Sequence, residues 1–468
     1  MDNKKTHARN VNENPCNMCM PMGGILAFKG IENAMIILHG AQGCATYMRR
    51  HIAEHFNEPV DIASSSLNEK GTIFGGEKNL KQGLNNLIKI YNPKLIGVLT
   101  TCLAETIGED IDRITAEYLQ EYELNDLAVV PVPTPGYGDS HFEGYWLTLK
   151  TLIFKLAQQT EKHQKINMII PNISPADIRE IKRILDLFHL DYIMVPDFSD
   201  TLDRPFSRPY KKVPEGGARP EDIAMMPGSV ATIQFGLTVE GNLSPGKYLE
   251  TEYGVPLYNL PIPIGIGSTD CFINALEKIT GCPVPDSLSM ERGRLLDCMI
   301  DSHKYNFHGR SVIFGEPELV YAMTKACLEN GIFPVAVATG SKNNRLGELL
   351  EPEISLSPVQ AVIMDETDFV QIRQKSVEMQ ANIAMGHSDG RYLEEREGIP
   401  LVRMGFPIHD RVGGQRLLSV GYTGTALFLD RITNALLEEK YKKYRKSLYN
   451  KYYLGGGQNE LRLANRKV

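Results

Sequence analysis

The chain contains no apolar run long enough to cross a membrane. A transmembrane helix needs about 18–20 predominantly apolar residues in a row, and the sequence has no such stretch. The first residues, Met-Asp-Asn-Lys-Lys-Thr-His, also lack the apolar core of a secretory signal peptide. We therefore expect a cytoplasmic protein with no membrane partner.

An excess of basic residues is missing as well. Lys and Arg number 50 against 57 Asp and Glu, which gives a formal net charge of −7. The one Lys-rich stretch, Glu438 to Lys451, alternates charge with Tyr and Leu at helical spacing, which predicts a solvated C-terminal helix. We expect no nucleic-acid partner.

Cysteine is too scarce for a disulfide framework. The chain has 8 cysteines in 468 residues, and large cytosolic chains rarely depend on disulfides. The thiols are therefore either buried core residues or metal and redox residues, and their positions have to decide between these alternatives.

Short apolar strands alternate with helical segments along most of the sequence. Helix signals lie between them, such as Ser174 ahead of Pro175 at a helix start and Gly331 at a helix end. The predicted strands are residues 35–39, 95–99, 129–133, 167–170, 192–195, 311–314, 335–338, 360–364 and 381–385.

This alternation predicts an α/β fold of three Rossmann-like domains, each with a parallel sheet flanked by helices. A chain of 468 residues also agrees with about three domains of ~150 residues each. We place the domains at residues 1–165, 166–310 and 311–468, the last with the C-terminal helix and a tail from Gly455 that we expect to be disordered.

Two cysteines directly follow strands of the first predicted domain. Cys44 ends the turn Gly40-Ala-Gln-Gly-Cys44 after strand 35–39, and Cys102 follows Thr100-Thr101 after strand 95–99. In parallel α/β folds, ligands bind beyond the carboxyl ends of the strands. Both thiols are therefore candidate ligands.

Cys16 and Cys19 form a Cys-x-x-Cys pair whose surroundings do not fit the usual uses of that spacing. A thioredoxin-type dithiol needs a preceding strand, whereas polar residues precede this pair and Pro21 follows it. A zinc ribbon needs a second Cys-x-x-Cys, which the sequence lacks. Iron–sulfur ligation fits better, because Gly23 and Gly24 would let the backbone approach a cluster closely.

Cys19, Cys44 and Cys102 together predict an iron–sulfur site. All three occupy turn positions where helix-start N–H groups can face an anionic cluster. Three thiolates leave a 4Fe–4S cluster one protein ligand short, which indicates a partner chain. Of the other cysteines, Cys282 precedes Pro283 in a loop, and Cys271, Cys298 and Cys327 lie on predicted helices among apolar residues. We expect these four to be inert core thiols.

Several long motifs follow one another in a fixed order from about residue 14 to residue 434. They are Met20-Pro-Met-Gly-Gly24, His39-Gly-Ala-Gln-Gly-Cys44, Phe74-Gly-Gly-Glu77, Thr100-Thr-Cys-Leu-Ala-Glu-Thr-Ile-Gly-Glu-Asp110, Thr134-Pro-Gly-Tyr-Gly-Asp-Ser-His141, Gly405-Phe-Pro-Ile-His-Asp-Arg411 and Gly421-Tyr-Thr-Gly424. In these motifs the chain resembles the β-type subunits of the nitrogenase component 1 family.

The resemblance implies a shared metal centre. Cys19, Cys44 and Cys102 match the β-side ligands of the 8Fe–7S P-cluster or of its 4Fe–4S counterpart. Ser140 lies where the catalytic subunit supplies a redox-dependent serine ligand, although a turn hydroxyl before a helix is an equal alternative, and Cys16 has no counterpart. The implied partners are an α-type chain, in a heterotetramer of two α-type and two β-type chains, and an ATP-dependent iron protein that donates electrons.

Two roles within this resemblance stay open. Val412-Gly-Gly-Gln-Arg416 after Arg411, together with His387-Ser-Asp-Gly-Arg391, is similar to the N-type subunit of the iron–molybdenum cofactor scaffold, which pairs with an E-type chain. We take this scaffold role as the leading interpretation. The full set of three cysteines instead favours the alternative, an electron-relay β subunit of a catalytic nitrogenase or nitrogenase-like reductase.

A glycine pair, one histidine and two glutamates are further candidates for functional residues. A dinucleotide-binding enzyme would need Gly-x-Gly-x-x-Gly after a strand, but Gly265-Ile-Gly267 lacks the third glycine. His39 ends an apolar strand and is predicted to be a hydrogen-bonded structural residue. Glu105 and Glu109, four residues apart after Cys102, are predicted to face solvent or an interface.

Overall fold

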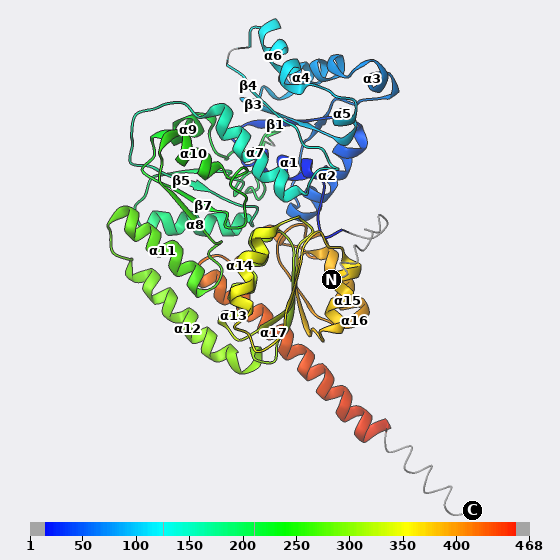
Figure 1. Cartoon of the computed structure of the whole chain (residues 1–468), viewed down its shortest axis with the longest axis vertical. Coiled ribbons are helices and arrows are strands. Elements are labelled where there is room, and N and C mark those ends of the chain that lie inside the picture. The colour runs from blue at the N-terminus through cyan, green and yellow to red at the C-terminus, as the bar shows by residue number, and fades with distance from the viewer. Residues whose placement is uncertain (1–14, 125, 210, 455–468) are drawn as a thin grey trace, which may run out of the picture.

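Three groups of strands, each flanked by helices, follow one another along the chain (Figure 1). This computed structural model describes residues 15–124, 126–209 and 211–454. The strands form two sheets of four strands and one of five, and neighbouring strands within each sheet are parallel. The fold is therefore α/β with three helix-flanked parallel sheets, as the sequence predicts.

The first sheet has the strand order β2-β1-β3-β4. Its strands are β1 (Ala34–His39), β2 (Ala63–Ser64), β3 (Leu95–Thr100) and β4 (Ala128–Val132). The helices of this part are α1 (Met20–Lys29), α2 (Gln42–Phe56), α3 (Glu69–Phe74), α4 (Glu77–Tyr91), α5 (Cys102–Thr106), α6 (Ile111–Glu121) and α7 (His141–Leu156). Both central strands, β1 and β3, are buried along their whole length, because helices cover both faces of the sheet.

The second sheet has the order β6-β5-β7-β8. Its strands are β5 (Ile166–Ile169), β6 (Tyr192–Val195), β7 (Thr232–Phe235) and β8 (Leu257–Leu260). The accompanying helices are α8 (Pro175–Leu187), α9 (Pro220–Met225), η1 (Met226–Gly228) and α10 (Pro245–Tyr253), and α11 (Ile266–Thr280) and α12 (Asp286–Asn306) lead on to the third sheet.

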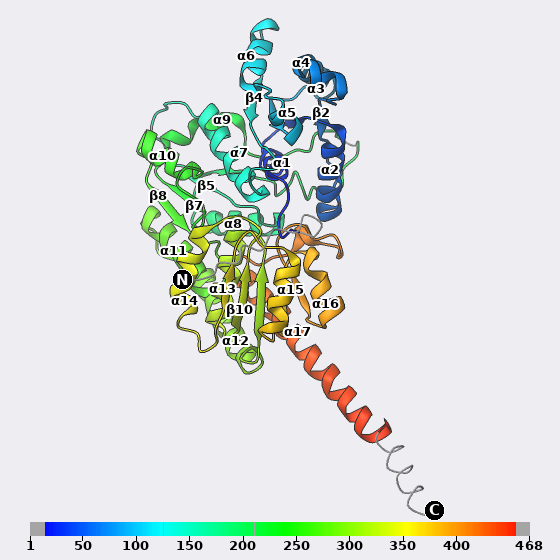
Figure 2. The same cartoon turned by 45° about the vertical axis from the view of Figure 1, so that its right-hand side comes forward.

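The third sheet has the order β11-β10-β9-β12-β13. Its strands are β9 (Arg310–Phe314), β10 (Phe333–Ala338), β11 (Val362–Met364), β12 (Ile383–Gly386) and β13 (Leu401–Arg403). Its helices are α13 (Pro317–Glu329), α14 (Asn344–Ile354), α15 (Phe369–Glu378), η2 (Ser388–Gly390), α16 (Arg391–Glu397), η3 (Gly414–Arg416), α17 (Gly421–Tyr449) and η4 (Asn450–Leu454). Figure 2 shows the second half of α17, which includes most of the predicted C-terminal helix, projecting away from the sheets.

Each strand predicted from the sequence is present, with its ends displaced by no more than one or two residues. The prediction missed β2, β7, β8 and β13. The predicted domain boundaries at residues 165/166 and 310/311 remain a prediction. The second boundary would separate Arg310 from the rest of β9. The tail from Gly455 lies outside the described residues.

Helices α1 and α7 are held unusually close to each other by two glycines. All ten residues of α1 are buried. A Cβ atom on Gly23 would lie 1.8 Å from the backbone oxygen of His141, and one on Gly144 would lie 2.0 Å from that of Met20. Since Cys19 directly precedes α1 and Ser140 directly precedes α7, this helix contact brings both candidate residues to the same place.

A buried glutamate connects the second and third sheets. Glu318, in the first turn of α13, accepts hydrogen bonds at Oε1 from the backbone N–H and the hydroxyl of Thr238, which follows β7. Within the described residues, its Oε2 has no hydrogen-bond partner. Burial raises the pKa of Glu318 to about 7, and this outweighs the donors of Thr238, which lower it.

The raised pKa predicts that Glu318 makes stability depend on pH. An unfolded glutamate has a pKa of about 4.3, so between that value and about 7 the folded chain binds the proton more tightly. The protonated carboxyl therefore contributes its full stabilisation at a pH below the pKa that Glu318 has in the unfolded chain. This stabilisation is lost as the pH rises through the pKa that Glu318 has in the folded chain. We expect the wild type to lose about 2 kcal/mol more than Glu318→Gln between pH 5 and pH 8.

Urea unfolding at both pH values measures this difference. Glu348→Gln, which changes an exposed glutamate on α14, is the matched control and should keep the wild-type dependence on pH. Identical pH dependence in the wild type and in Glu318→Gln would contradict the prediction.

Candidate metal centre

The carboxyl ends of β1 and β3 lie side by side, with His39 opposite Thr100 in the parallel pairing. The chain leaves β1 through Gly40 and enters α2, whose first turn contains Cys44. It leaves β3 through Thr101 and enters α5, whose first residue is Cys102. The fold therefore places both cysteines at the carboxyl edge of the first sheet, where parallel folds bind ligands.

The two turns pack closely, with the Thr101 side chain against Gly40. A Cβ atom on Gly40 would lie 1.9 Å from Oγ1 of Thr101, so only glycine fits there. The backbone N–H of Thr101 donates a hydrogen bond of 3.1 Å to the carbonyl oxygen of His39. These contacts fix the segments that carry Cys44 and Cys102 relative to each other.

Cys19 reaches the same region from the start of α1. A Cβ atom on Gly136 would lie 2.9 Å from Sγ of Cys102 and 3.8 Å from Sγ of Cys19. The two sulfur atoms are therefore no farther apart than the sum of these distances. Gly136 keeps the space beside both sulfurs free of a side chain, which suits a bulky inorganic group.

The three thiols lie close enough for the charge of one to raise the pKa of another. The pKa of Cys19 is raised, first by burial and then by the charges of Cys102 and Cys44. The pKa of Cys44 is raised by burial and then by the charge of Cys102. Thiolates so close together repel one another, and a bound cation would reverse the shifts by favouring the charged forms.

The donor set fits a cluster better than a single ion. In the part of the chain that the structure describes, no three His, Cys, Asp or Glu side chains converge closely enough to hold one metal ion. The thiolates of an iron–sulfur cluster bind different irons and therefore stand farther apart. Cys19 and Cys102 are exposed and Cys44 is half-buried, so a cluster here would lie at the surface, where a second chain could cover it. That these three cysteines are ligands stays a prediction.

Ser140 has a structural role in this fold. Its hydroxyl accepts a hydrogen bond from the backbone N–H of Phe142, and the Glu143 side chain accepts one from the N–H of Ser140, which forms a capping box for α7. The Ser140 hydroxyl also lies 2.6 Å from that of Ser341 in the third part of the chain. The alternative interpretation of Ser140 as a turn hydroxyl before a helix therefore has direct support, although the serine lies next to Cys19 in an antiparallel bridge.

Cys16 does not join the other three cysteines. Its side chain is 2% exposed, and its Sγ lies 3.6 Å from Nε2 of His387 in the third part of the chain. The two residues of the Cys-x-x-Cys pair thus point to different surroundings.

The prediction that Glu105 and Glu109 face solvent or an interface is wrong for Glu109, whose side chain is 7% exposed, while for half-buried Glu105 it stays a prediction. Glu109 accepts hydrogen bonds from the backbone N–H of Gly76 and from Nε2 of buried His39, while Glu105 accepts one from the Thr100 hydroxyl. The helical spacing failed because α5 ends at Thr106 and Gly108, at φ +75°, redirects the chain. His39 is a hydrogen-bonded structural residue, as predicted, and burial lowers its pKa.

The four remaining cysteines do not all lie in the core. Cys327 is buried and Cys298 is half-buried, but Cys271 and Cys282 are exposed, which corrects the prediction of core thiols for these two. Cys271 lies on the outer face of α11, and Cys282 follows the end of that helix. Within the described residues, no helix has the length and apolarity to cross a membrane.

Sequence reasoning missed Gly136, which lies between Cys19 and Cys102. The only signal was its place in the Thr134-Pro-Gly motif, and nothing in that motif by itself points to Cys102. It also missed the third-part residues that hold Cys16, because they lie more than 300 positions away in the sequence.

The fold and the candidate site together define a class of α/β protein that has three parallel sheets and exposed thiols at the carboxyl edge of the first sheet. The family described as Nitrogenase component 1 type Oxidoreductase matches residues 19–437, and the chain belongs to this family. It is similar to the nitrogenase molybdenum-iron protein beta chains of Methanothermobacter thermautotrophicus (36% identity, 92% of this chain and 95% of the relative) and Clostridium pasteurianum (35%, 91% and 93%). It is a β-type component 1 subunit.

Two further likenesses support this assignment. The nitrogenase vanadium-iron protein beta chain of Trichormus variabilis is 33% identical, over 96% of this chain and 98% of the relative. The solved structure titled "Nitrogenase Cp1 at pH 6.5" superposes with a TM-score of 0.86 at 34% identity, covering 92% of this chain and 94% of that one.

Proposed function

We propose that this chain is the β subunit of a catalytic component 1, which relays electrons through an iron–sulfur cluster shared with an α-type chain. The observation that carries the proposal is the meeting of Cys19, Cys44 and Cys102 at one sheet edge, with Gly136 leaving space beside the sulfurs. The relatives at 33–36% identity are named as β chains of molybdenum–iron and vanadium–iron proteins, which supports the catalytic alternative over the scaffold role.

The three thiolates would hold the cluster, which when bound supplies reversible one-electron transfer. Helix-start positions for Cys44 and Cys102 would offer backbone N–H groups to its sulfides. Thr101 and Gly40 would keep both ligand turns fixed during oxidation and reduction, because neither turn can move without breaking their contact.

The surface around the exposed thiols has the features of a binding site for a partner chain. A cleft of about 300 Å³ contains Cys19, Tyr47, Gly136 and Tyr137, and both tyrosines are exposed. Exposed aromatic side chains beside incomplete ligation favour a protein interface at this place. We therefore propose that an α-type chain covers the cleft and completes the ligand set, in a heterotetramer that receives electrons from an ATP-dependent iron protein.

A second candidate function is the iron–molybdenum cofactor scaffold. Val412-Gly-Gly-Gln-Arg416 favours it, since this motif is similar to the N-type subunit of that scaffold. Both functions need a cluster at the interface with the partner chain. The cluster expected for the catalytic subunit and the cluster expected for the scaffold therefore differ in size and not in position.

Iron counting with electron paramagnetic resonance on the complex co-purified with the α-type chain tests the proposal. An 8Fe–7S centre at the interface is the expected result. A 4Fe–4S centre would favour the scaffold instead, and a complex whose interface binds no iron would overturn both.

A further inference from the structure

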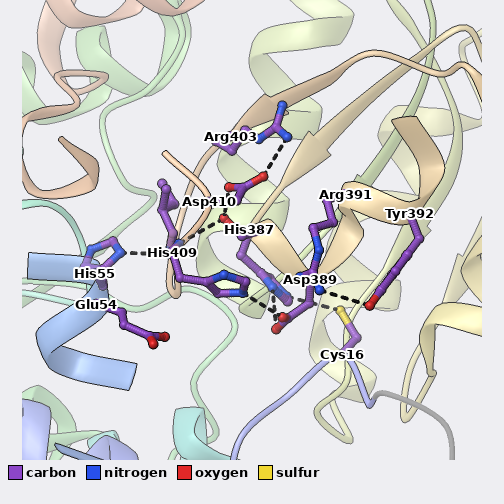
Figure 3. Close-up of polar contacts among 12 residues, drawn as sticks. Cys16, Glu54, His55, His387, Asp389, Arg391, Tyr392, Arg403, His409 and Asp410 are labelled. Carbon is purple, nitrogen blue, oxygen red and sulfur yellow. Dashed lines mark hydrogen bonds and ion pairs between the residues drawn. The ribbon is translucent and has the colours of Figure 1, made fainter. Parts of the chain in front are cut away.

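Residues 15–19 connect the first and third parts of the chain, and their backbone bends at Cys16 and Asn17. Figure 3 shows this segment entering beside His387 and Asp389, which follow β12. Cys16 and Cys19 are three positions apart in it, yet Cys16 is buried and Cys19 is exposed. The segment therefore connects the interior of the third part with the candidate metal centre.

Hydrogen bonds hold the segment to loops that follow β10 and β11. The N–H of Cys16 donates to the carbonyl oxygen of Thr367 at 3.3 Å, and Nδ2 of Asn17 donates to that of Gly340 at 2.7 Å. A Cβ atom on Gly340 would lie 2.3 Å from the carbonyl oxygen of Cys16. Only glycine at this position allows the segment to lie so close.

The Cys16 side chain completes an apolar core that otherwise belongs to the third part of the chain. The other buried members of this core are Val312, Phe314, Ala336, Ala338, Phe369, Ile372, Ala384, Leu393, Ile399 and Leu401. Within it, Sγ of Cys16 lies 3.6 Å from Nε2 of His387. In this apolar pocket the thiol meets the His387 ring and backbone groups of Gly340 and Gly315.

The imidazole of His387 is held by ring packing and by an ion-pair approach to Asp389, although within the described residues its Nδ1 has no hydrogen-bond partner. The rings of Phe314 and Phe369 contact it edge-on, each at 5.5 Å between centroids. Its Nδ1 lies 3.3 Å from one carboxylate oxygen of Asp389, whose other oxygen lies 3.2 Å from Nε2 of His409. Figure 3 shows these groups in a row.

One protonation pattern suits these contacts. With its Nδ1 proton toward the Asp389 carboxylate, His387 accepts the S–H of Cys16 at Nε2. Burial, and then the charge of Asp389, raises the pKa of Cys16 well above its usual range. The thiol is therefore a protonated hydrogen-bond donor, neither a nucleophile nor a free thiolate.

The other end of the segment is held by the first part of the chain. The carbonyl oxygen of Met18 accepts from the N–H of His141 at 2.9 Å, and the N–H of Met18 donates to Nδ1 of the same histidine at 3.2 Å. Cys19 then forms a bridge with Ser140, whose hydroxyl contacts that of Ser341. Cys19 is thus positioned from both sides.

We propose that Cys16 is a positioning residue which, through His387 and Asp389, locks the segment that presents Cys19 to the metal centre. The proposal rests on the proposed function only in taking Cys19 as a ligand. Cys16 lies apart from the three cysteines of the candidate metal centre, because its thiol is buried against Nε2 of His387. The Cys-x-x-Cys pair is thus divided into an anchor and a ligand.

Hydrogen exchange of the full chain, followed by mass spectrometry, tests the lock without any metal. In Cys16→Ala and in His387→Phe, which keeps the ring packing, we expect the amides of residues 16–20 and 22 to exchange at least tenfold faster. Cys327→Ala, which removes another fully buried thiol from α13, is the matched control and should leave this segment unchanged. The double variant should exchange no faster than either single one, because both remove the same contact.

The assembled complex gives a second measurement. Cys16→Ala and His387→Phe should change the resonance spectrum and the midpoint potential of the bound cluster, whereas Cys327→Ala should not. Unchanged exchange of residues 16–20 and 22 in both variants would overturn the proposal, even where Cys19 binds iron. A different outcome would separate the two proposals. If exchange is faster in Cys16→Ala and His387→Phe but Cys19→Ala keeps all its iron, the positioning role of Cys16 is supported and the ligand role of Cys19 is contradicted.

Discussion

Replacing Cys44 by alanine is expected to remove most of the iron from the complex with the α-type chain. Cys44 lies in the first turn of α2, close enough to Cys102 for the charge of Cys102 to raise its pKa, so its loss would remove one of the three proposed thiolate ligands. Loss of groups that only orient metal ligands typically weakens binding about 10–100-fold, so loss of a thiolate ligand should lower bound iron at least about tenfold. Cys19→Ala and Cys102→Ala should behave in the same way.

The measurement is iron per complex after gel filtration, with circular dichroism of each variant to show that the fold is kept. Cys271→Ala is the matched control, because Cys271 is also an exposed cysteine but lies on α11, in another part of the chain. Each ligand variant should also associate less with the α-type chain, since thiolate–iron bonds would tie the two chains together. Full iron retention after all three substitutions together would end the site assignment.

The strand pattern was predictable because most strands are short apolar runs in the centre of a sheet. Leu95–Thr100 is buried at every position, and apolar residues fill it almost without interruption. β8 was missed because it is an edge strand whose residues are all half-buried, so Leu257–Leu260 lacks that signal. β2 was missed because it has only two residues.

The candidate centre was predictable where a ligand follows a buried strand. Cys44 and Cys102 meet because β1 and β3 are parallel neighbours, and the sequence shows both strand ends. The surroundings of Cys16 were not predictable, since His387 and Gly340 approach it only through the packing of the third sheet. The turn at Gly108 likewise redirected Glu109 to His39 and removed it from the helix face that spacing alone predicts.

The largest effect on folding is expected from Gly144→Ala. The added Cβ would lie 2.0 Å from the carbonyl oxygen of Met20, and because that atom belongs to the backbone of buried α1, the helices themselves would have to separate. Overpacking of a core typically costs 1–3 kcal/mol and sometimes more, and a clash of two backbones should lie at the upper end, at about 3 kcal/mol of unfolding free energy.

Urea unfolding of Gly144→Ala measures this loss, and Gly43→Ala is its control in the same part of the chain. Gly43 lies in α2, where a Cβ atom would meet nothing within 4 Å, so alanine should stabilise the helix by about 0.5–1 kcal/mol. Because α1 begins after Cys19 and α7 begins after Ser140, forcing these helices apart should also move Cys19 away from Gly136 and Cys102. Gly144→Ala should therefore bind less iron even at low temperature, where it stays folded, while Gly43→Ala, next to Cys44, keeps its iron. Equal stability of the two variants would show that α1 and α7 do not depend on this close approach.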